Sequence, residues 1–323
     1  MNAALDLLAG MVLEDGRRWG DAATIWQWAF ARNMLDPAAP PFRWESRPRG
    51  GSKTTDVAAI VLAAMVVGMP AGAACDCYAA DRDQARLLMD ALAGLVLRTP
   101  QLASVVTVDQ YKARTTSGVT LEVMAADAAS AFGRRPHFVI VDELCNWPST
   151  SNTRSLWAAI YSSMPKVPGA RLAVCTTSGD PVHWSRKVRD KALSSPLWTV
   201  AEIPGPLPWI DPAQLEEQRR MLPDSAYLRL HLNQWAAAED RLVNEGDLAA
   251  CVTLSGPQEP QPGFQYVFGV DVGLKNDRTV GAVCHAEPLE GRTGKRVVLD
   301  RLQVWQGSRL HPVALGDVEA SLL

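Results

Sequence analysis

The alternation of short apolar runs with helical segments between residues 55 and 177 constrains the fold of this chain more than any other feature. The run His137-Phe-Val-Ile-Val-Asp142 stays apolar until it ends in an acid, as strands buried on both faces of a parallel sheet do. Similar runs stand at 73–79, 118–124 and 171–177, and helices are expected at 55–69 and 81–97. Because parallel neighbours need crossover connections, this order predicts an α/β domain with a parallel central sheet and right-handed crossovers.

The pattern changes near residue 205, where prolines punctuate the chain. We therefore expect a first domain over 1–205 that includes an N-terminal, Trp-rich helical segment. A linker over 206–262 should follow, with one amphipathic helix over Pro212–Ala238. Strand-like runs at 265–270, 279–285 and 296–305 indicate a further domain over 263–323.

Composition excludes several classes of protein. Apolar residues make up 47% of the 323 residues and charged residues 21%, which excludes a disordered or collagen-like chain. A net charge of −3 excludes nucleic-acid binding through bulk positive charge, so any DNA contact must come from local basic clusters. Two such clusters are Arg134-Arg135 and residues 186–191, which are either DNA contacts or solvated helical faces. The longest apolar run, 57–68, is too short to cross a bilayer, and the six cysteines fit free thiols in a reducing compartment. These observations predict a soluble, cytoplasmic protein.

The stretch Arg47-Pro-Arg-Gly-Gly-Ser-Lys-Thr-Thr55 has the parts of a phosphate-binding loop. Such a loop needs small residues whose N–H groups converge on phosphate oxygens, a lysine for the β- and γ-phosphates, and a hydroxyl for Mg²⁺ at a helix start. The strict pattern G-x-x-x-x-G-K-[ST] fails here, because Arg47 and Ser52 replace its glycines. A Gly-rich, basic turn that caps an apolar helix is the other interpretation.

Two later elements strengthen the nucleotide interpretation. The strand ending in Asp142-Glu143 fits a Walker-B motif, in which the first acid serves the Mg²⁺ shell and the second polarises the attacking water. The following strand runs into Cys175-Thr-Thr-Ser-Gly179, where nucleic-acid motors sense the γ-phosphate; alone it is equally an ordinary turn. Together the elements predict a P-loop domain that hydrolyses ATP.

From about residue 15 to its end, the chain resembles the large terminase subunit of tailed double-stranded DNA phages, the ATPase and nuclease that packages the genome. Arg49 precedes Lys53 by four positions, as in the family's deviant phosphate loop, and Ile25-Trp-Gln27-Trp is similar to its adenine-side segment. The stretches Gly133–Glu143 and Thr176-Thr177 resemble the family's Walker-B and coupling motifs. The stretches Tyr227–Trp235 and Phe268–Thr279 resemble its linker and the first strand of its RNase-H-like nuclease.

The resemblance implies a role for each matching residue. Arg49 would act on the γ-phosphate and Glu143 as the catalytic carboxylate, while Thr54 and Asp142 would serve Mg²⁺. Asp271 would ligate a nuclease metal, Mg²⁺ or Mn²⁺, whereas Asp277 would be a further ligand or a turn cap. The residues expected around ATP are Gln27, Arg49, Gly50, Gly51, Ser52, Lys53, Thr54, Thr55, Asp142, Thr176 and Thr177.

The same resemblance implies partners: double-stranded DNA, the phage portal and the small terminase subunit. We expect a ring-shaped homo-oligomer on the procapsid and a monomer when the protein is free. The expected location is the cytoplasm of the infected bacterium, with no membrane association. A two-metal site needs at least three carboxylates, whereas Asp271 and Asp277 are the only acids that match the family's nuclease ligands. The nuclease domain is therefore expected to be incomplete and inactive. Two alternatives stay open: another P-loop translocase or helicase, and a degenerate terminase relative that does not hydrolyse ATP.

Overall fold

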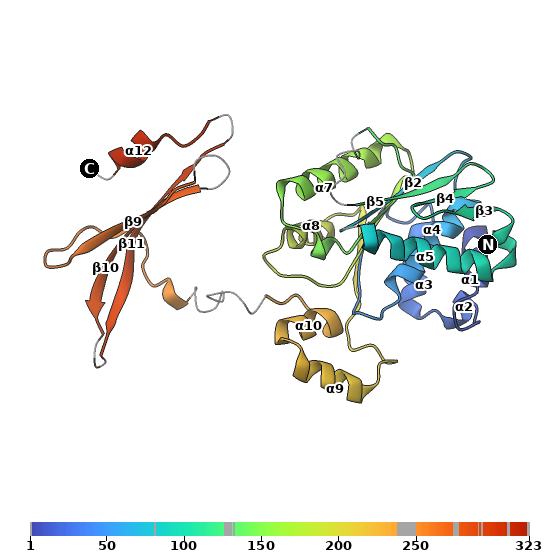
Figure 1. Cartoon of the computed structure of the whole chain (residues 1–323), viewed down its shortest axis with the longest axis horizontal. Helices are drawn as coiled ribbons and strands as arrows, with labels where there is room; N and C mark the ends of the chain where they lie inside the picture. The colour runs from blue at the N-terminus through green and yellow to red at the C-terminus, as the bar shows by residue number, and fades with distance from the viewer. Residues whose placement is uncertain are drawn as a thin grey trace. The chain divides into compact units, whose positions relative to one another are not determined.

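The computed structural model describes residues 2–80, 82–125, 131, 133–237, 250–273, 278–289, 291, 293–308 and 311–321. The chain divides into two compact units, Met1–Leu242 and Val243–Leu323 (Figure 1).

The described part of the first unit is built on one sheet of eight strands. In spatial order they are β3 (Val106–Val108), β4 (Lys112–Thr115), β5 (Thr120–Ala125), β2 (Ala74–Ala79), β6 (Phe138–Asp142), β7 (Arg171–Thr176), β1 (Phe42–Ser46) and β8 (Trp198–Glu202). From β5 to β8 every neighbouring pair is parallel, and β3 and β4 form an antiparallel extension at one edge. The predicted α/β fold with a parallel central sheet is confirmed.

Helices pack on both faces of this sheet (Figure 1). In β6, Phe138 and Ile140 pack with the cluster that buries α1, α3, α4 and α5, whereas Val139 and Val141 pack with α7. The helices of the unit are α1 (Ala3–Gly10), α2 (Trp19–Ala22), α3 (Ile25–Leu35), α4 (Lys53–Ala63), α5 (Arg82–Arg98), α6 (Pro100–Ala103), α7 (Ser151–Ser163), α8 (Trp184–Leu193), α9 (Pro212–Met221) and α10 (Asp224–Leu232). A short π-helix covers Ala64–Gly68, and short 3-10 helices cover Leu144–Asn146 and Met164–Lys166. Because helices cover both faces, successive residues of the central strands are buried on one face and then on the other. This explains why their sequences are continuously apolar.

One expectation about the helices is wrong. The single helix expected over Pro212–Ala238 is two helices, α9 and α10, which are separated at Leu222 and Pro223. Proline has no N–H for the helical ladder and its ring disfavours the helical conformation of the preceding residue, so α9 ends there. Leu222 accordingly has an extended backbone, with φ −94° and ψ 148°.

In the second unit, the described residues form an antiparallel sheet of three strands in the order β11–β10–β9. Its elements are β9 (Tyr266–Asp271), β10 (Arg278–Pro288), β11 (Lys295–Gln306) and α12 (Leu315–Ala320). All three strands were expected from the sequence. In neither unit do the described residues include a helix with the length and apolar character needed to cross a membrane.

Candidate active site

Three neighbouring strands carry the predicted motifs to one edge of the sheet. Parallel β6, β7 and β1 lie side by side, and their carboxyl ends lead into residues 142–143, 176–178 and 47–53. Ligands of open α/β sheets bind outside the carboxyl ends of strands, so this edge is the expected location of a site.

The loop between β1 and α4 has a backbone that depends on small residues. Gly50 has φ +78°, and Ser52 has φ +54° and ψ +26°, which is the left-handed region. A Cβ at Gly51 would lie 2.9 Å from the carbonyl oxygen of Pro48, so no side chain fits at that position. Ser52 pays roughly 1–2 kcal/mol for its conformation, which glycine adopts freely. The helix α4 begins immediately afterwards, at Lys53.

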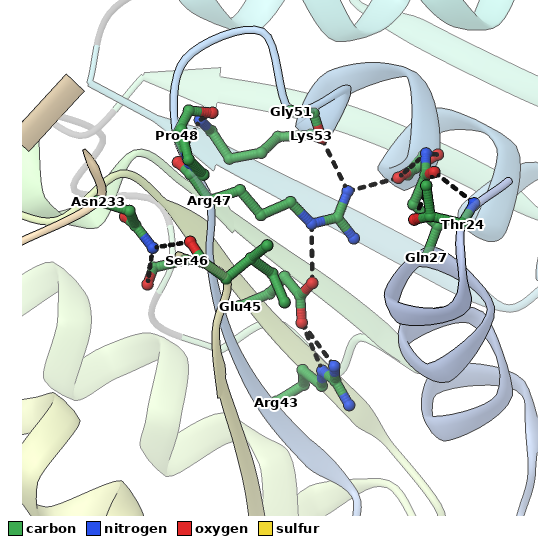
Figure 2. A network of polar contacts seen from close by, with 12 residues as sticks. Thr24, Gln27, Arg43, Glu45, Ser46, Arg47, Pro48, Gly51, Lys53 and Asn233 are labelled. Carbon is green, nitrogen blue, oxygen red and sulfur yellow. Dashed lines mark hydrogen bonds and ion pairs between the residues drawn. The ribbon is translucent and has the colours of Figure 1, made fainter. Parts of the chain in front are cut away.

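A buried chain of charges supports this loop from below (Figure 2). Arg43 donates to Glu45 Oε2 at 2.6 and 2.9 Å, and Arg47 Nε donates to Glu45 Oε1 at 2.8 Å. Arg47 Nη1 donates to Asp56 Oδ2 at 2.5 Å and to the Gly51 carbonyl at 3.0 Å. Arg47 thereby holds the loop carbonyl and the first turn of α4 together.

Arg47 is fully buried, so its charge needs these partners. Burial opposes the charge, but Asp56 and Glu45 outweigh burial and raise the pKa of the guanidinium. Its carbon Cζ also lies 4.3 Å from the ring centroid of Trp26, within cation–π range. Sequence reasoning missed this role, although the alternation Arg43-x-Glu45-x-Arg47 places all three side chains on one face of a strand.

Gln27 belongs to the same network and borders a cavity. Its Nε2 donates to Asp56 at 2.9 and 3.0 Å, and its Oε1 accepts from the N–H of Thr24 at 2.8 Å. The cavity has a volume of about 600 Å³ and is lined on one side by Gln27, Ser52 and Thr55. Trp209 also lines it, stacked on Trp26 at 6.1 Å between centroids. Such a cavity beside the loop and α4 can hold the base and ribose of a nucleotide.

Lys53 and Glu143 meet across the site. Lys53 Nζ lies 3.3 Å from Glu143 Oε1 and 3.2 Å from the carbonyl oxygen of Arg47, so the ammonium faces the loop. Glu143 has φ +48°, and its N–H donates to the Cys175 carbonyl at 2.7 Å. Its Oε2 accepts from the N–H and the Oγ1 of Thr177, both at 2.9 Å, and Thr176 Oγ1 lies at 3.4 Å.

Asp142 is suited to a metal shell. Burial, with the neighbouring Glu143 charge, raises its pKa to about 7, although Lys53 acts against the shift. When burial raises the pKa of a carboxyl group in this way, a nearby cation strongly stabilises its ionised form. Thr54, half-buried in the first turn of α4, supplies the hydroxyl at the loop.

Arg49 lies apart from this group. Its side chain is exposed, and no hydrogen bond or ion pair of that side chain occurs among the described residues. Its N–H instead donates to the carbonyl of Leu230 in α10 at 2.7 Å. Its predicted action on a γ-phosphate therefore stays a prediction.

Arginines of both basic clusters pair with acids. Arg134 donates to Asp76 at 2.6 and 2.8 Å and to Glu122 at 2.8 Å. Arg186 pairs with Asp190 at 3.1 Å. These pairs favour the interpretation as structural or solvated side chains over phosphate contacts.

In the second unit, Asp271 is the last residue of β9 and is exposed. Asp277 lies outside the described residues. Within the described ranges, no three His, Cys, Asp or Glu side chains gather closely enough to hold a metal ion.

Comparison with known proteins bears on the first unit above all. Residues 46–187 match the family described as terminase large subunit, ATPase domain. That segment contains the loop, Asp142-Glu143 and Thr176-Thr177. Residues 46–187 are a terminase large-subunit ATPase domain.

Solved structures of large terminases share the fold. The large terminase of bacteriophage HK97 matches with a TM-score of 0.64 and 18% identity, over 94% of this chain and 67% of that one. The large terminase of the thermophilic bacteriophage D6E, in complex with ADP, gives 0.53 and 15%, over 93% and 73%. The ATPase domain of the Thermus phage P74-26 large terminase gives 0.53 and 14%, over 66% and 94%. No curated protein sequence matches the chain.

Proposed function

We propose that this chain is an ATP-driven motor that moves double-stranded DNA into a phage procapsid. One observation carries the ATPase part: Lys53 Nζ, at the start of α4, lies 3.3 Å from Glu143 Oε1, just after β6, within the segment that matches the terminase ATPase domain. The lysine is placed for phosphate oxygens and the glutamate for the water that attacks the γ-phosphorus.

The residues present fit ATP with Mg²⁺. N–H groups of the loop and the start of α4 offer donors and a positive helix end to phosphates. Thr54 and Asp142 offer the hard oxygen ligands that Mg²⁺ prefers, and the ion, when bound, neutralises charge on the β- and γ-phosphates. Glu143, held by Thr177, orients the water and accepts its proton.

The test of the ATPase assignment is Lys53→Ala. We expect it to abolish turnover or ATP binding, measured by phosphate release and calorimetric titration. Lys166→Ala, at an exposed lysine of the same unit, is the matched control and should retain both. Unchanged affinity and turnover in Lys53→Ala would remove the basis for the assignment.

The motor role rests on the family assignment and is tested by assembly. We propose a ring of copies that acts on the phage portal with the small terminase subunit, in the cytoplasm of an infected bacterium, and a monomer when free. Light scattering should find a monomer, whose basal turnover is low, and empty procapsids together with double-stranded DNA should raise that turnover. A stable, highly active free dimer would argue for another class of P-loop enzyme.

A helicase is less well supported by the second unit. Its described residues form an antiparallel sheet, whereas a helicase would carry another ATPase-like α/β unit.

We propose instead that this unit belongs to an RNase-H-like nuclease in which Asp271 is a metal ligand. Asp271 alone cannot hold two cations, and no three acids, histidines or cysteines of the described residues gather closely enough to hold a metal. The 323-residue chain should therefore leave a plasmid supercoiled in Mn²⁺. Digestion that Asp271→Ala abolishes would show that further ligands complete the site.

A further inference from the structure

Asn233 joins segments that are far apart in the sequence. It follows α10, has φ +54° and is 7% exposed. Its Nδ2 donates to Ser46 Oγ at 3.0 Å and to the Ile203 carbonyl at 2.9 Å (Figure 2). Its Oδ1 accepts from the N–H of Ser178 at 2.9 Å, and the Ser178 hydroxyl donates to the Asn233 backbone carbonyl at 2.7 Å, with Oδ1 at 3.0 Å. The side-chain amide therefore uses both of its donors, and its oxygen accepts from a backbone N–H.

The partners of Asn233 lead to both halves of the ATPase site. Ser46 ends β1 and directly precedes Arg47, which holds the phosphate loop. Ser178 directly follows Thr177, whose N–H and hydroxyl hold the Glu143 carboxylate. One side chain thus fixes the base of the loop relative to the turn that positions Glu143.

The segment around Asn233 also contacts the loop through its backbone. The N–H of Arg49 donates to the Leu230 carbonyl at 2.7 Å. Earlier in the linker, the side chain of Trp209 also donates to the loop, from Nε1 to the Gly50 carbonyl at 3.3 Å. Leu230 lies one turn before Asn233 in α10. The position of α10 and the geometry of the loop are therefore not independent.

We infer that Asn233 is a positioning residue of the hydrolysis site, and that turnover requires α10 to be seated against the loop. This inference rests on the proposed ATPase function. A helix cap alone would explain the left-handed backbone of an asparagine here, but it would not require three side-chain hydrogen bonds to segments that end β1 or follow β8 and β7.

The decisive variant is Asn233→Gly, because glycine keeps the left-handed backbone and removes only the side chain. We expect kcat to fall on the order of 10- to 100-fold, as when a catalytic group is misplaced by about 1 Å. The KM for ATP should stay within roughly 3-fold, since Lys53 and the loop remain. Gln234→Ala removes the exposed amide next in sequence and should behave as wild type.

Asn233→Asp separates the two arms of the contact. Aspartate tolerates the same backbone and still accepts from Ser178, but it donates to neither Ser46 nor Ile203. Its kcat should lie between those of wild type and Asn233→Gly. Hydrogen exchange should show the Arg49 and Ser178 amides losing protection in Asn233→Gly, and the Ser178 amide keeping it in Asn233→Asp.

Each outcome decides something. A folded Asn233→Gly with wild-type kcat, or one whose KM rises as much as kcat falls, overturns the positioning role. If this variant does not fold, Ser178→Ala, which removes one donor to Asn233, must lower kcat with KM unchanged, or the inference is wrong. Failure of the proposed function is seen separately, as a wild-type chain without ATPase activity or a Lys53→Ala chain that keeps it.

Discussion

At the scale of single residues, the site depends on carboxylates whose surroundings set their roles. Glu143 has one oxygen on Lys53 and the other on Thr177, so its position is fixed from both sides. Asp142, one residue earlier, has a pKa raised to about 7 by burial and by the charge of Glu143. Adjacent acids in different environments suit different tasks, which agrees with the metal shell proposed for Asp142 and the base proposed for Glu143.

Glu143→Gln should separate hydrolysis from binding. Glutamine keeps the shape and an oxygen that accepts from Thr177, but it lacks the charge that polarises water. We expect kcat to fall about 10²-fold or more, with nucleotide affinity retained in calorimetry. Glu217→Gln, on the exposed α9, is the control. An active Glu143→Gln enzyme, or one that no longer binds ATP, would contradict the role.

Asp56→Asn should destabilise the first unit strongly. Asparagine still accepts from Trp19 and Gln27, but Arg47 loses an ionic partner while fully buried. Breaking a buried pair in this way costs about 3–5 kcal/mol. Chemical denaturation should show this loss, whereas Asp190→Asn, which breaks an exposed pair with Arg186, should cost about 0–1 kcal/mol. Equal effects of the two changes would mean that the buried chain is not a support of the loop.

At the scale of elements, the linker helices are held close to the β1 loop. Gly205 follows β8, and its N–H donates to the Leu232 carbonyl at 3.2 Å. A Cβ at this position would lie 1.8 Å from the backbone oxygen of His231. Close backbone approach therefore requires glycine here.

Gly205→Ala should push α10 away from its seat. We expect a lower melting temperature of the first unit and faster hydrogen exchange at the Arg49 amide, which donates to Leu230 of α10. Gly256→Ala is the matched control, since its Cβ would meet nothing within 4 Å. Normal protection of the Arg49 amide in Gly205→Ala would show that α10 can move without disturbing the loop.

The sequence was sufficient for elements with a clear hydrophobic pattern. The strands β2, β5, β6 and β7 and the helices α4 and α5 stand where their apolar runs predicted. The strand β1 was missed because buried Arg43, Glu45 and Arg47 give it a polar sequence, and only tertiary ion pairs make that burial possible. The roles of Arg47 and Asn233 could not be predicted for the same reason, because the contacts that define them are tertiary.

At the scale of the whole molecule, the second unit has an electrostatic feature of its own. His285 is 9% exposed, and its ring nitrogens lie 2.7 Å from Asp300 and 3.2 Å from Glu287. The hydrogen bond to Asp300, with Glu287 nearby, raises the pKa of His285. Arg296 on the adjoining strand β11 pairs with Glu287.

This unit should therefore be more stable at acidic than at alkaline pH, within the range that His285 titrates. A raised pKa in the folded state means that protonated His285 stabilises fully below its ordinary value of 6.5. This contribution is lost as pH rises through the higher, folded value. Amide exchange of β10 and β11 at pH 5.5 and 8, corrected for intrinsic rates, should show the difference. His285→Gln should abolish it and His311→Gln, at an exposed site, should not.

The stack of Trp209 on Trp26 has a consequence for spectroscopy. Of the 11 tryptophans, all but Trp305 belong to the unit Met1–Leu242, so the intrinsic fluorescence of the chain reports almost wholly on that unit. Trp209 is 48% exposed and bonded to the loop carbonyl of Gly50, which makes its emission sensitive to any shift between loop and linker. Titration with ADP should change the emission spectrum without any attached dye, and Trp209→Phe should remove most of that change. The protein therefore contains its own optical probe of the contact between the phosphate loop and the linker.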